Sequence, residues 1–187
     1  MTQPDYILRA ATAADVPALS RLAISSFVDK FGDLYSSADL SAFIEGSLSE
    51  ANIAAEMANP DRLYRLAERD GELLAFCKLG LSCGFPQHAR GRRVLELKQL
   101  YAAAAATGGG IGGALMDWAM AEFAARGADE VQLSVYSGNA GAQRFYARHG
   151  FEKVADVTFK VGEQIDAEFL FAKQLQGGVN SPVSAQT

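Results

Sequence analysis

Apolar residues recur every three or four positions in the first third of the chain, which is the period of an amphipathic helix. Val16, Leu19, Leu22 and Ala23 follow Asp15 at this spacing and predict a first helix. The same spacing predicts two more helices before residue 60: one capped by Ser37, with Leu40, Phe43, Ile44 and Leu48 on one face, and a short one over Ala51–Ala58, ended by Asn59-Pro60.

Beyond residue 60 the apolar pattern changes to the two-residue alternation of β-strands. Leu63–Glu68 and Leu73–Leu81 flank Asp70-Gly71, a favoured hairpin turn. Helices are predicted between later strands over about 113–126, closed by Gly127, and over Asn139–His149, closed by Gly150. The remaining predicted strands are Tyr6–Ala10, Val94–Tyr101, the alternating run Val131, Leu133 and Val135, and a final pair, Val154–Val161 and Glu168–Lys173.

This order predicts an α/β protein with one mixed, largely antiparallel central sheet and helices on both faces. The length of 187 residues fits one domain, which we place at residues 1–176. Residues 177–187 contain Gly, Ser, Pro and Gln with little to bury, so a disordered tail is expected there.

Composition and charge exclude several classes of function. The net charge of −5 argues against a nucleic-acid binder, and no metal-site spacing links Cys77, Cys83, His88 and His149. The 18 uncharged residues from Gln99 to Met116 are mostly Ala and Gly, which disfavours a membrane span. No signal peptide is apparent, and both cysteines are expected to be reduced core thiols. We therefore expect a cytoplasmic protein with no membrane partner.

Five glycines occupy six positions at 108–113, directly ahead of a predicted helix. Glycine lets a ligand approach the backbone closely, and a helix start offers unpaired N–H groups to an anion such as phosphate. Gly108-x-Gly110-x-x-Gly113, with Asp129 about twenty residues on, matches the dinucleotide fingerprint. The context argues against that interpretation, because residues 102–107 separate the loop from its strand and Asp129 begins a strand rather than ending one.

Two other motifs, about 27 residues apart, fit more positions. Thr107-x-x-Gly110-Ile111-Gly112 lies between a strand and a helix, and Asn139-x-x-Ala142-x-x-Phe145-Tyr146 is followed by Gly150-Phe151. In both motifs the chain resembles the GCN5-related N-acetyltransferase (GNAT) family. The resemblance covers about residues 6–175 and departs from the family at Thr107, where Gln or Arg is usual, and at the alanines of 102–106.

The resemblance implies acetyl-CoA as the donor, with the pyrophosphate held by backbone N–H groups of the glycine loop. A small amine would receive the acetyl group by direct transfer in a ternary complex. A protein or peptide acceptor and a non-catalytic acyl-CoA-binding module are the alternatives, and a homodimer is an alternative to a monomer. The cofactor-binding residues implied are Leu100, Tyr101, Ala102, Thr107, Gly108, Gly109, Gly110, Ile111, Gly112, Gly113, Asn139 and Arg144.

The same resemblance implies Tyr146 as the general acid beside the cofactor sulfur and Glu96 as a base acting through water. Tyr146 could instead be a packed aromatic, and Glu96 a solvated glutamate at a strand end. Asn139 would cap its helix, contact the cofactor, or do both. Arg144 and Arg148 lie one turn apart and would either meet the cofactor's phosphates or line a solvated face.

Residues 12–59 are the part least like the family and are expected to select the acceptor. Seven acids against two bases give this segment a net charge of −5, which suits a cationic amine or merely reflects solvated helix faces. Phe27, Phe31 and Tyr35 would wall the acceptor pocket or, as we favour, belong to the core.

Overall fold

The computed structural model describes residues 5–175, so the predicted tail lies outside the described residues. Seven strands form one sheet in the order β1-β2-β3-β4-β5-β7-β6. Only β4 and β5 pair in parallel, and every other neighbouring pair is antiparallel. The strands are β1 (Ile7–Ala10), β2 (Arg62–Arg69), β3 (Glu72–Gly80), β4 (Val94–Ala102), β5 (Glu130–Tyr136), β6 (Glu152–Val161) and β7 (Gln164–Gln174).

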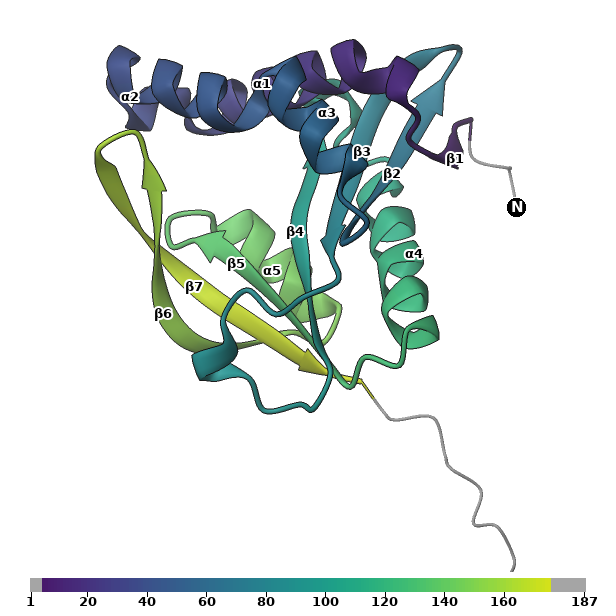
Figure 1. Ribbon diagram of the computed structural model, residues 1–187, viewed down its shortest axis with the longest axis vertical. Coiled ribbons are helices and arrows are strands. Elements are labelled where there is room, and N and C mark those ends of the chain that lie inside the picture. The colour runs from purple at the N-terminus through teal and green to yellow at the C-terminus, as the bar shows by residue number, and fades with distance from the viewer. Residues whose placement is uncertain (1–4, 176–187) are drawn as a thin grey trace, which may run out of the picture.

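Helices cover both faces of this sheet, as predicted (Figure 1). α1, α2 and α3 cross one face, where Phe27, Leu66 and Phe76 belong to one buried cluster. α4 and α5 cover the other face, where Leu115, Phe123 and Leu133 belong to a second cluster. The helices are α1 (Val16–Phe31), α2 (Ser37–Phe43), α3 (Glu50–Ala58), α4 (Ile111–Ala125) and α5 (Ala140–Arg148).

The predicted elements all form, with shifted ends. Ser36, not Ser37, caps α2, because its side chain accepts the N–H of Asp39. A π-helical turn over Ile44–Leu48, which the sequence pattern did not predict, follows α2, and α3 begins one residue before its predicted start. α4 begins at Ile111, two residues before its predicted start, so the last two loop glycines lie in its first turn. β6 and β7 are longer than predicted, which brings Asp166 into the sheet.

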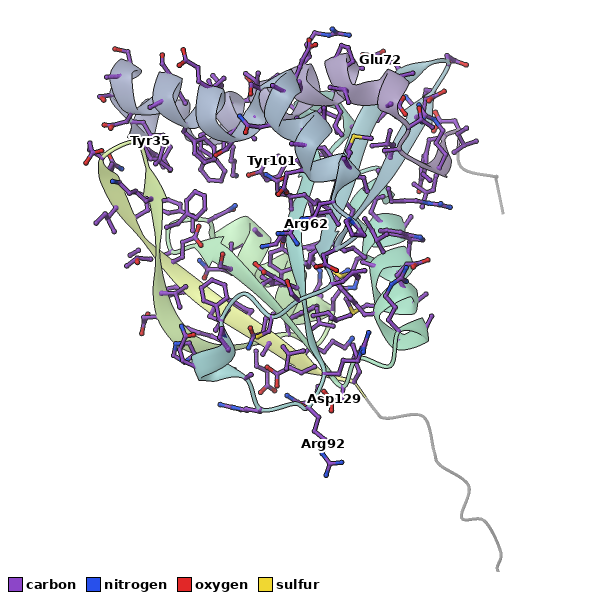
Figure 2. The ribbon with its side chains drawn as sticks, in the orientation of Figure 1. Tyr35, Arg62, Glu72, Arg92, Tyr101 and Asp129 are labelled. Carbon is purple, nitrogen blue, oxygen red and sulfur yellow. The ribbon has the colours of Figure 1, made fainter. Side chains whose placement is uncertain are left out.

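A β-bulge in β4 sets the direction of the side chains in the last residues of the strand. The register shifts by one residue opposite Lys78 and Leu79, so Lys98 is an extra residue on β4. Lys98 and Gln99 then lie on the same side of the strand, and Tyr101 joins the cluster under α1 while Leu100 and Ala102 pack on the α4 side. Figure 2 shows Tyr101 beneath the layer formed by α1–α3.

The tip of the β6–β7 hairpin is fastened to α2. The Glu163 N–H donates to Asp39 Oδ1 at 2.7 Å. The Phe43 and Phe159 rings pack edge to face, with their centroids 5.8 Å apart. The Tyr35 hydroxyl donates to Asp166 Oδ2. Figure 1 shows this hairpin rising to α2, and Figure 2 places Tyr35 at the junction. We call these three contacts the latch.

Candidate active site

The site begins where β4 and β5 separate. They pair only over Val94–Glu96 and Glu130–Gln132, although both strands continue for several residues. A cavity of about 960 Å³ lies there, with residues of β4 and β5 along its sides. Its lining includes Gly112, Asn139 and Tyr146 from the α4–α5 side, and Phe31 and Tyr35 from the opposite side. One cavity therefore reaches both faces of the sheet.

The glycine loop has the geometry of an anion cradle. Gly110 caps α4 with φ 79°, a left-handed conformation that glycine adopts without strain. Among the described residues, the backbone N–H groups of 108–113 have no acceptor within the protein. A Cβ built on Gly108, Gly110 or Gly113 would lie close to no non-neighbouring atom, so the space beside the loop is open. Free N–H groups at a helix start in open space fit a pyrophosphate.

Thr107 has a local role at the entrance to this loop. Its hydroxyl donates to the Ala104 carbonyl at 2.8 Å and closes the 3-10 turn over Ala104–Ala106. Thr107 also lines the cavity. The residue at the usual Gln or Arg position is therefore part of the loop's own structure, which leaves phosphate contacts to the backbone.

The end of β4 presents a backbone N–H to the cavity. The Ala103 N–H donates to Leu74 O on β3 at 2.8 Å, and N–H groups alternate in direction along a strand. The Ala102 N–H therefore points toward β5, where β4 has no partner beyond Glu96. Leu100, Tyr101 and Ala102, all predicted to bind cofactor, line the cavity. A donor in this position suits an oxygen that gains negative charge during reaction.

Tyr146 is both a packed aromatic and a cavity residue. Its ring lies 5.4 Å from Phe145 and 6.1 Å from Phe151, centroid to centroid, and its side chain lines the cavity. Burial raises the pKa of Tyr146 well above its usual range, and nearby Cys77 and Tyr101 raise it further. The hydroxyl therefore stays protonated at neutral pH and is available as a proton donor. The two interpretations of this residue are compatible.

Asn139 lines the cavity, whereas the two arginines of α5 do not. The Asn139 side chain accepts the Ala142 N–H at 3.2 Å, which confirms the predicted cap, and Asn139 also lines the cavity. Arg144 and Arg148 are exposed and neither lines the cavity. The geometry therefore gives Arg144 no place in the cavity, and a contact with phosphate outside it stays a prediction.

Glu96 is not the solvated glutamate of a strand end. It is the third residue of β4, only 7% exposed, and lines the cavity. Its Oε2 accepts a hydrogen bond from Lys98 Nζ at 2.9 Å. The carboxylate of Glu96 thus already has a charged partner within the protein, and a base role for it stays a prediction.

The acids of residues 12–59 do not face the cavity. None of the seven lines it, and Asp15, Asp39 and Glu56 bind Arg9, the β6–β7 turn and Lys78, respectively. Phe27, Phe31 and Tyr35 line the cavity, and Phe27 is also buried in the core at 4% exposure. The carboxylates that do line it are Glu96, Asp166 and Glu168.

The hairpin β6–β7 was missing from the predicted site. Asp166 and Glu168 lie two residues apart on β7 and so share one face, and Phe159 lies opposite Asp166 on β6. All three line the cavity. The available signal was the alternation of polar and apolar residues over 164–169, which places two acids on one face of a strand whose later residues are buried.

Asp129 is committed to a loop and not to a ligand. Its carboxylate accepts the N–H groups of Arg92 and Arg93 at 2.9 Å each, where β4 and β5 begin, at the lower end of the molecule in Figure 2. This bonding lowers the pKa of Asp129. The GxGxxG match therefore lacks the acidic partner that a dinucleotide site requires.

Among residues 5–175 no group of His, Cys, Asp or Glu has the arrangement of a metal site, and no helix is long and apolar enough to cross a membrane. Cys77 and Cys83 are both free thiols. Cys77 is buried in the core, whereas Cys83 is only half-buried and donates to Gln132 Oε1, so the prediction of two core thiols holds for Cys77 alone.

Comparison with known proteins identifies the family. The model of the acetyltransferase (GNAT) family matches residues 26–151. An uncharacterised N-acetyltransferase from Mycobacterium bovis is 31% identical over 137 residues, which cover 73% of this chain and 82% of the relative. The chain therefore belongs to the acetyltransferase (GNAT) family and is an N-acetyltransferase by class.

Two further proteins that are similar to this chain have names that mention a substrate or a bound ligand. Aminoalkylphosphonate N-acetyltransferase from Salmonella typhimurium is 31% identical over 115 residues, which cover 62% of this chain and 69% of the relative. The crystal structure of a PaiA N-acetyltransferase from Thermoplasma acidophilum, in complex with coenzyme A, superposes with a TM-score of 0.75 at 22% identity. That match covers 94% of this chain and all of the other and confirms the predicted fold.

Proposed function

We propose that this chain transfers the acetyl group of acetyl-CoA to the primary amine of a small molecule, directly and within one ternary complex. The observation that carries the proposal is the single cavity lined by Tyr146 and Asn139 on one side and by Phe31 and Glu168 on the other. The free N–H groups of 108–113 support acetyl-CoA as donor, as does the coenzyme A bound to the PaiA protein of similar fold.

The chain's own residues would act as follows. The glycine loop binds the pyrophosphate, and the Ala102 N–H donates to the thioester oxygen as it gains charge. Tyr146 gives its proton to the sulfur that leaves. A direct transfer needs no protein nucleophile, and burial raises the pKa of both Cys77 and Cys83, which keeps these thiols from acting as thiolates.

The latch supports a small acceptor over a polypeptide. The contacts Asp39–Glu163, Tyr35–Asp166 and Phe43–Phe159 join α2 and the segment just before it to the hairpin, across the end of the cavity that carries Phe31 and Phe159. An extended peptide would need that end open, whereas a short amine does not. The aminoalkylphosphonate enzyme, which is similar in sequence, is named for a small amine.

Thermal unfolding and thiol release test the proposal together. Acetyl-CoA at about a hundred times its Kd should stabilise the protein by roughly 2.7 kcal/mol, and NADH should not. A panel of short alkylamines should then release free coenzyme A thiol faster than tetrapeptides bearing one free amine. Stabilisation without thiol release from any amine would indicate an acyl-CoA-binding module, and peptides as the better acceptors would indicate a protein acetyltransferase.

A further inference from the structure

Glu168 differs from the other carboxylates of the cavity in having an oxygen without a partner. Glu96 binds Lys98, and Asp166 accepts hydrogen bonds from Tyr35 and, at 2.7 Å, from Gln164 Nε2. The Oε2 atom of Glu168 is buried and has no hydrogen-bond partner among the described residues. A buried carboxylate oxygen left unpaired is costly, so an atom at a binding site in this state indicates a ligand that completes it.

The position of Glu168 places it between the two halves of the cavity. It lies on β7 opposite Tyr136 of β5, and both residues line the cavity. Its charge is close enough to Tyr35 and Tyr101 to raise the pKa of each, and Tyr101 in turn influences Tyr146. The carboxylate is thus within electrostatic reach of the acceptor end and of the residues next to the general acid.

The surroundings of Glu168 suit a cation. Burial raises the pKa of Glu168, the Ser134 side chain lowers it, and the charge of Asp166 raises it again; no cationic side chain contributes. Phe27, Phe31, Phe43 and Phe159 line the same cavity, and aromatic faces attract ammonium groups. The titratable groups that line the cavity with Glu168 are Asp166 on β7, Tyr136 on β5, Glu96, Lys98 and Tyr101 on β4, Lys78 on β3, Lys30 on α1, Tyr35 before α2, and Tyr146 on α5.

We infer that Glu168 binds the ammonium group of the acceptor and accepts its proton, so that the acceptor is a cationic primary amine with a short apolar body. This inference rests on the proposed function. It assigns to Glu168 the role that sequence analysis gave to Glu96, whose charge is already balanced by Lys98. As a group that touches the substrate, Glu168 would be a catalytic residue.

The proposed reaction moves three protons, forms one N–C bond and breaks one C–S bond. One ammonium proton passes to Glu168 Oε2, and the freed lone pair forms the N–C bond to the acetyl carbon. The C–S bond breaks, and the sulfur takes the proton of Tyr146. The second proton leaving the nitrogen restores Tyr146, and Glu168 releases its proton to solvent. The products are the amide, coenzyme A thiol and one proton.

The test compares Glu168→Gln with Glu152→Gln, a variant that removes the same charge at an exposed position on β6 of the same hairpin, outside the cavity lining and the latch. Each is assayed with butylamine, which is an ammonium ion at pH 8, and with trifluoroethylamine, which is largely neutral there. For Glu168→Gln we expect kcat/KM with butylamine to fall about 100-fold. With the neutral amine we expect a much smaller loss. The acidic limb of the pH profile of kcat/KM for butylamine should move to higher pH, because the variant can use only the free amine, while stabilisation by acetyl-CoA stays as in the wild type.

Two results would overturn the inference while leaving the proposed function intact. One is wild-type kinetics in Glu168→Gln with an unchanged pH profile, and the other is an equal loss for both amines, which would indicate a structural role. A wild-type protein that binds acetyl-CoA but turns over neither amine would instead contradict the proposed function, and the role of Glu168 with it. Glu152→Gln is expected to behave as the wild type throughout.

Discussion

Tyr146 is the residue on which the proposed chemistry depends most directly. Its hydroxyl is kept protonated by burial, so removing only that oxygen should affect turnover and not packing. We predict that Tyr146→Phe lowers kcat with the best amine by at least about 100-fold while acetyl-CoA still stabilises the protein against heat. The matched control is Tyr64→Phe, because Tyr64 is also a buried tyrosine but does not line the cavity.

Thiol release under saturating acetyl-CoA is the measurement for both variants. Equal kcat in Tyr146→Phe and the wild type would remove Tyr146 from the mechanism. A loss of acetyl-CoA stabilisation in Tyr146→Phe alone would reassign the residue to donor binding.

Glu168 also has a consequence for stability. Its pKa is raised in the fold above the ordinary 4.5, so the folded protein holds this proton more tightly than the unfolded chain. The stability it contributes is present below pH 4.5 and is lost as the pH rises through the raised pKa. We therefore predict that Glu168→Gln, which cannot ionise, has a higher Tm than the wild type at pH 8, and that this difference shrinks toward pH 4.

The check is calorimetric unfolding of the two proteins, without ligands, at several pH values. Glu152→Gln, whose carboxylate is exposed, should show no such trend. A wild type more stable than Glu168→Gln at pH 8 would mean that the carboxylate has a favourable partner in the free protein.

At the scale of elements, two glycines at the start of α4 have different structural roles. Gly110 has φ 79° and cannot take a side chain without strain, whereas Gly113 is an ordinary helical residue with open space beside it. We predict that Gly110→Ala lowers stability by about 1 kcal/mol or more and that Gly113→Ala raises it by roughly 0.5–1 kcal/mol. Opposite shifts in Tm, measured by thermal unfolding, would confirm the pair; shifts of the same sign would contradict it.

The elements themselves were predictable because each depends on local periodicity and turn residues. The hairpin at Asp70-Gly71 and the helix closed by Gly127 follow from short stretches of sequence. The positions of the glycine loop and of the Asn139–Tyr146 segment were predictable for the same reason, because both are continuous motifs at helix starts. Glu168 was not, because its role depends on β7 pairing beside β5, a contact between distant parts of the chain.

The sequence also could not predict which charged side chains form ion pairs or hydrogen bonds with each other. Lys98 lies on the same side of β4 as Glu96 and binds it, so the expected base is already paired. Pairing of β7 beside β5 likewise brings Glu168 near Ser134 and Tyr136 and leaves one of its oxygens unpaired. Which carboxylate is free follows from strand register, and no local pattern encodes that.

At the scale of the whole molecule, the latch is the contact that should set the size of the acceptor. Asp39 accepts hydrogen bonds from the Glu163 N–H and from the Ser36 hydroxyl, and these two bonds lower the pKa of Asp39. We predict that Asp39→Ala loosens the hairpin from α2 and reduces the preference for butylamine over a lysine-containing tetrapeptide, with kcat/KM for the peptide rising several-fold. Ser41→Ala, an exposed position on the same helix that makes none of the latch contacts, is the control. An unchanged preference in Asp39→Ala would show that the latch does not select the acceptor.

The most direct test of the account is the kinetic order of the two substrates, because the central claim is that donor and acceptor meet in one cavity. Initial rates of thiol release would be measured with acetyl-CoA and butylamine both varied, together with the mass of the protein after incubation with acetyl-CoA alone. Direct transfer in a ternary complex gives intersecting double-reciprocal lines and an unmodified protein mass. Parallel lines, with one acetyl group added to the protein, would contradict it and reveal a covalent intermediate.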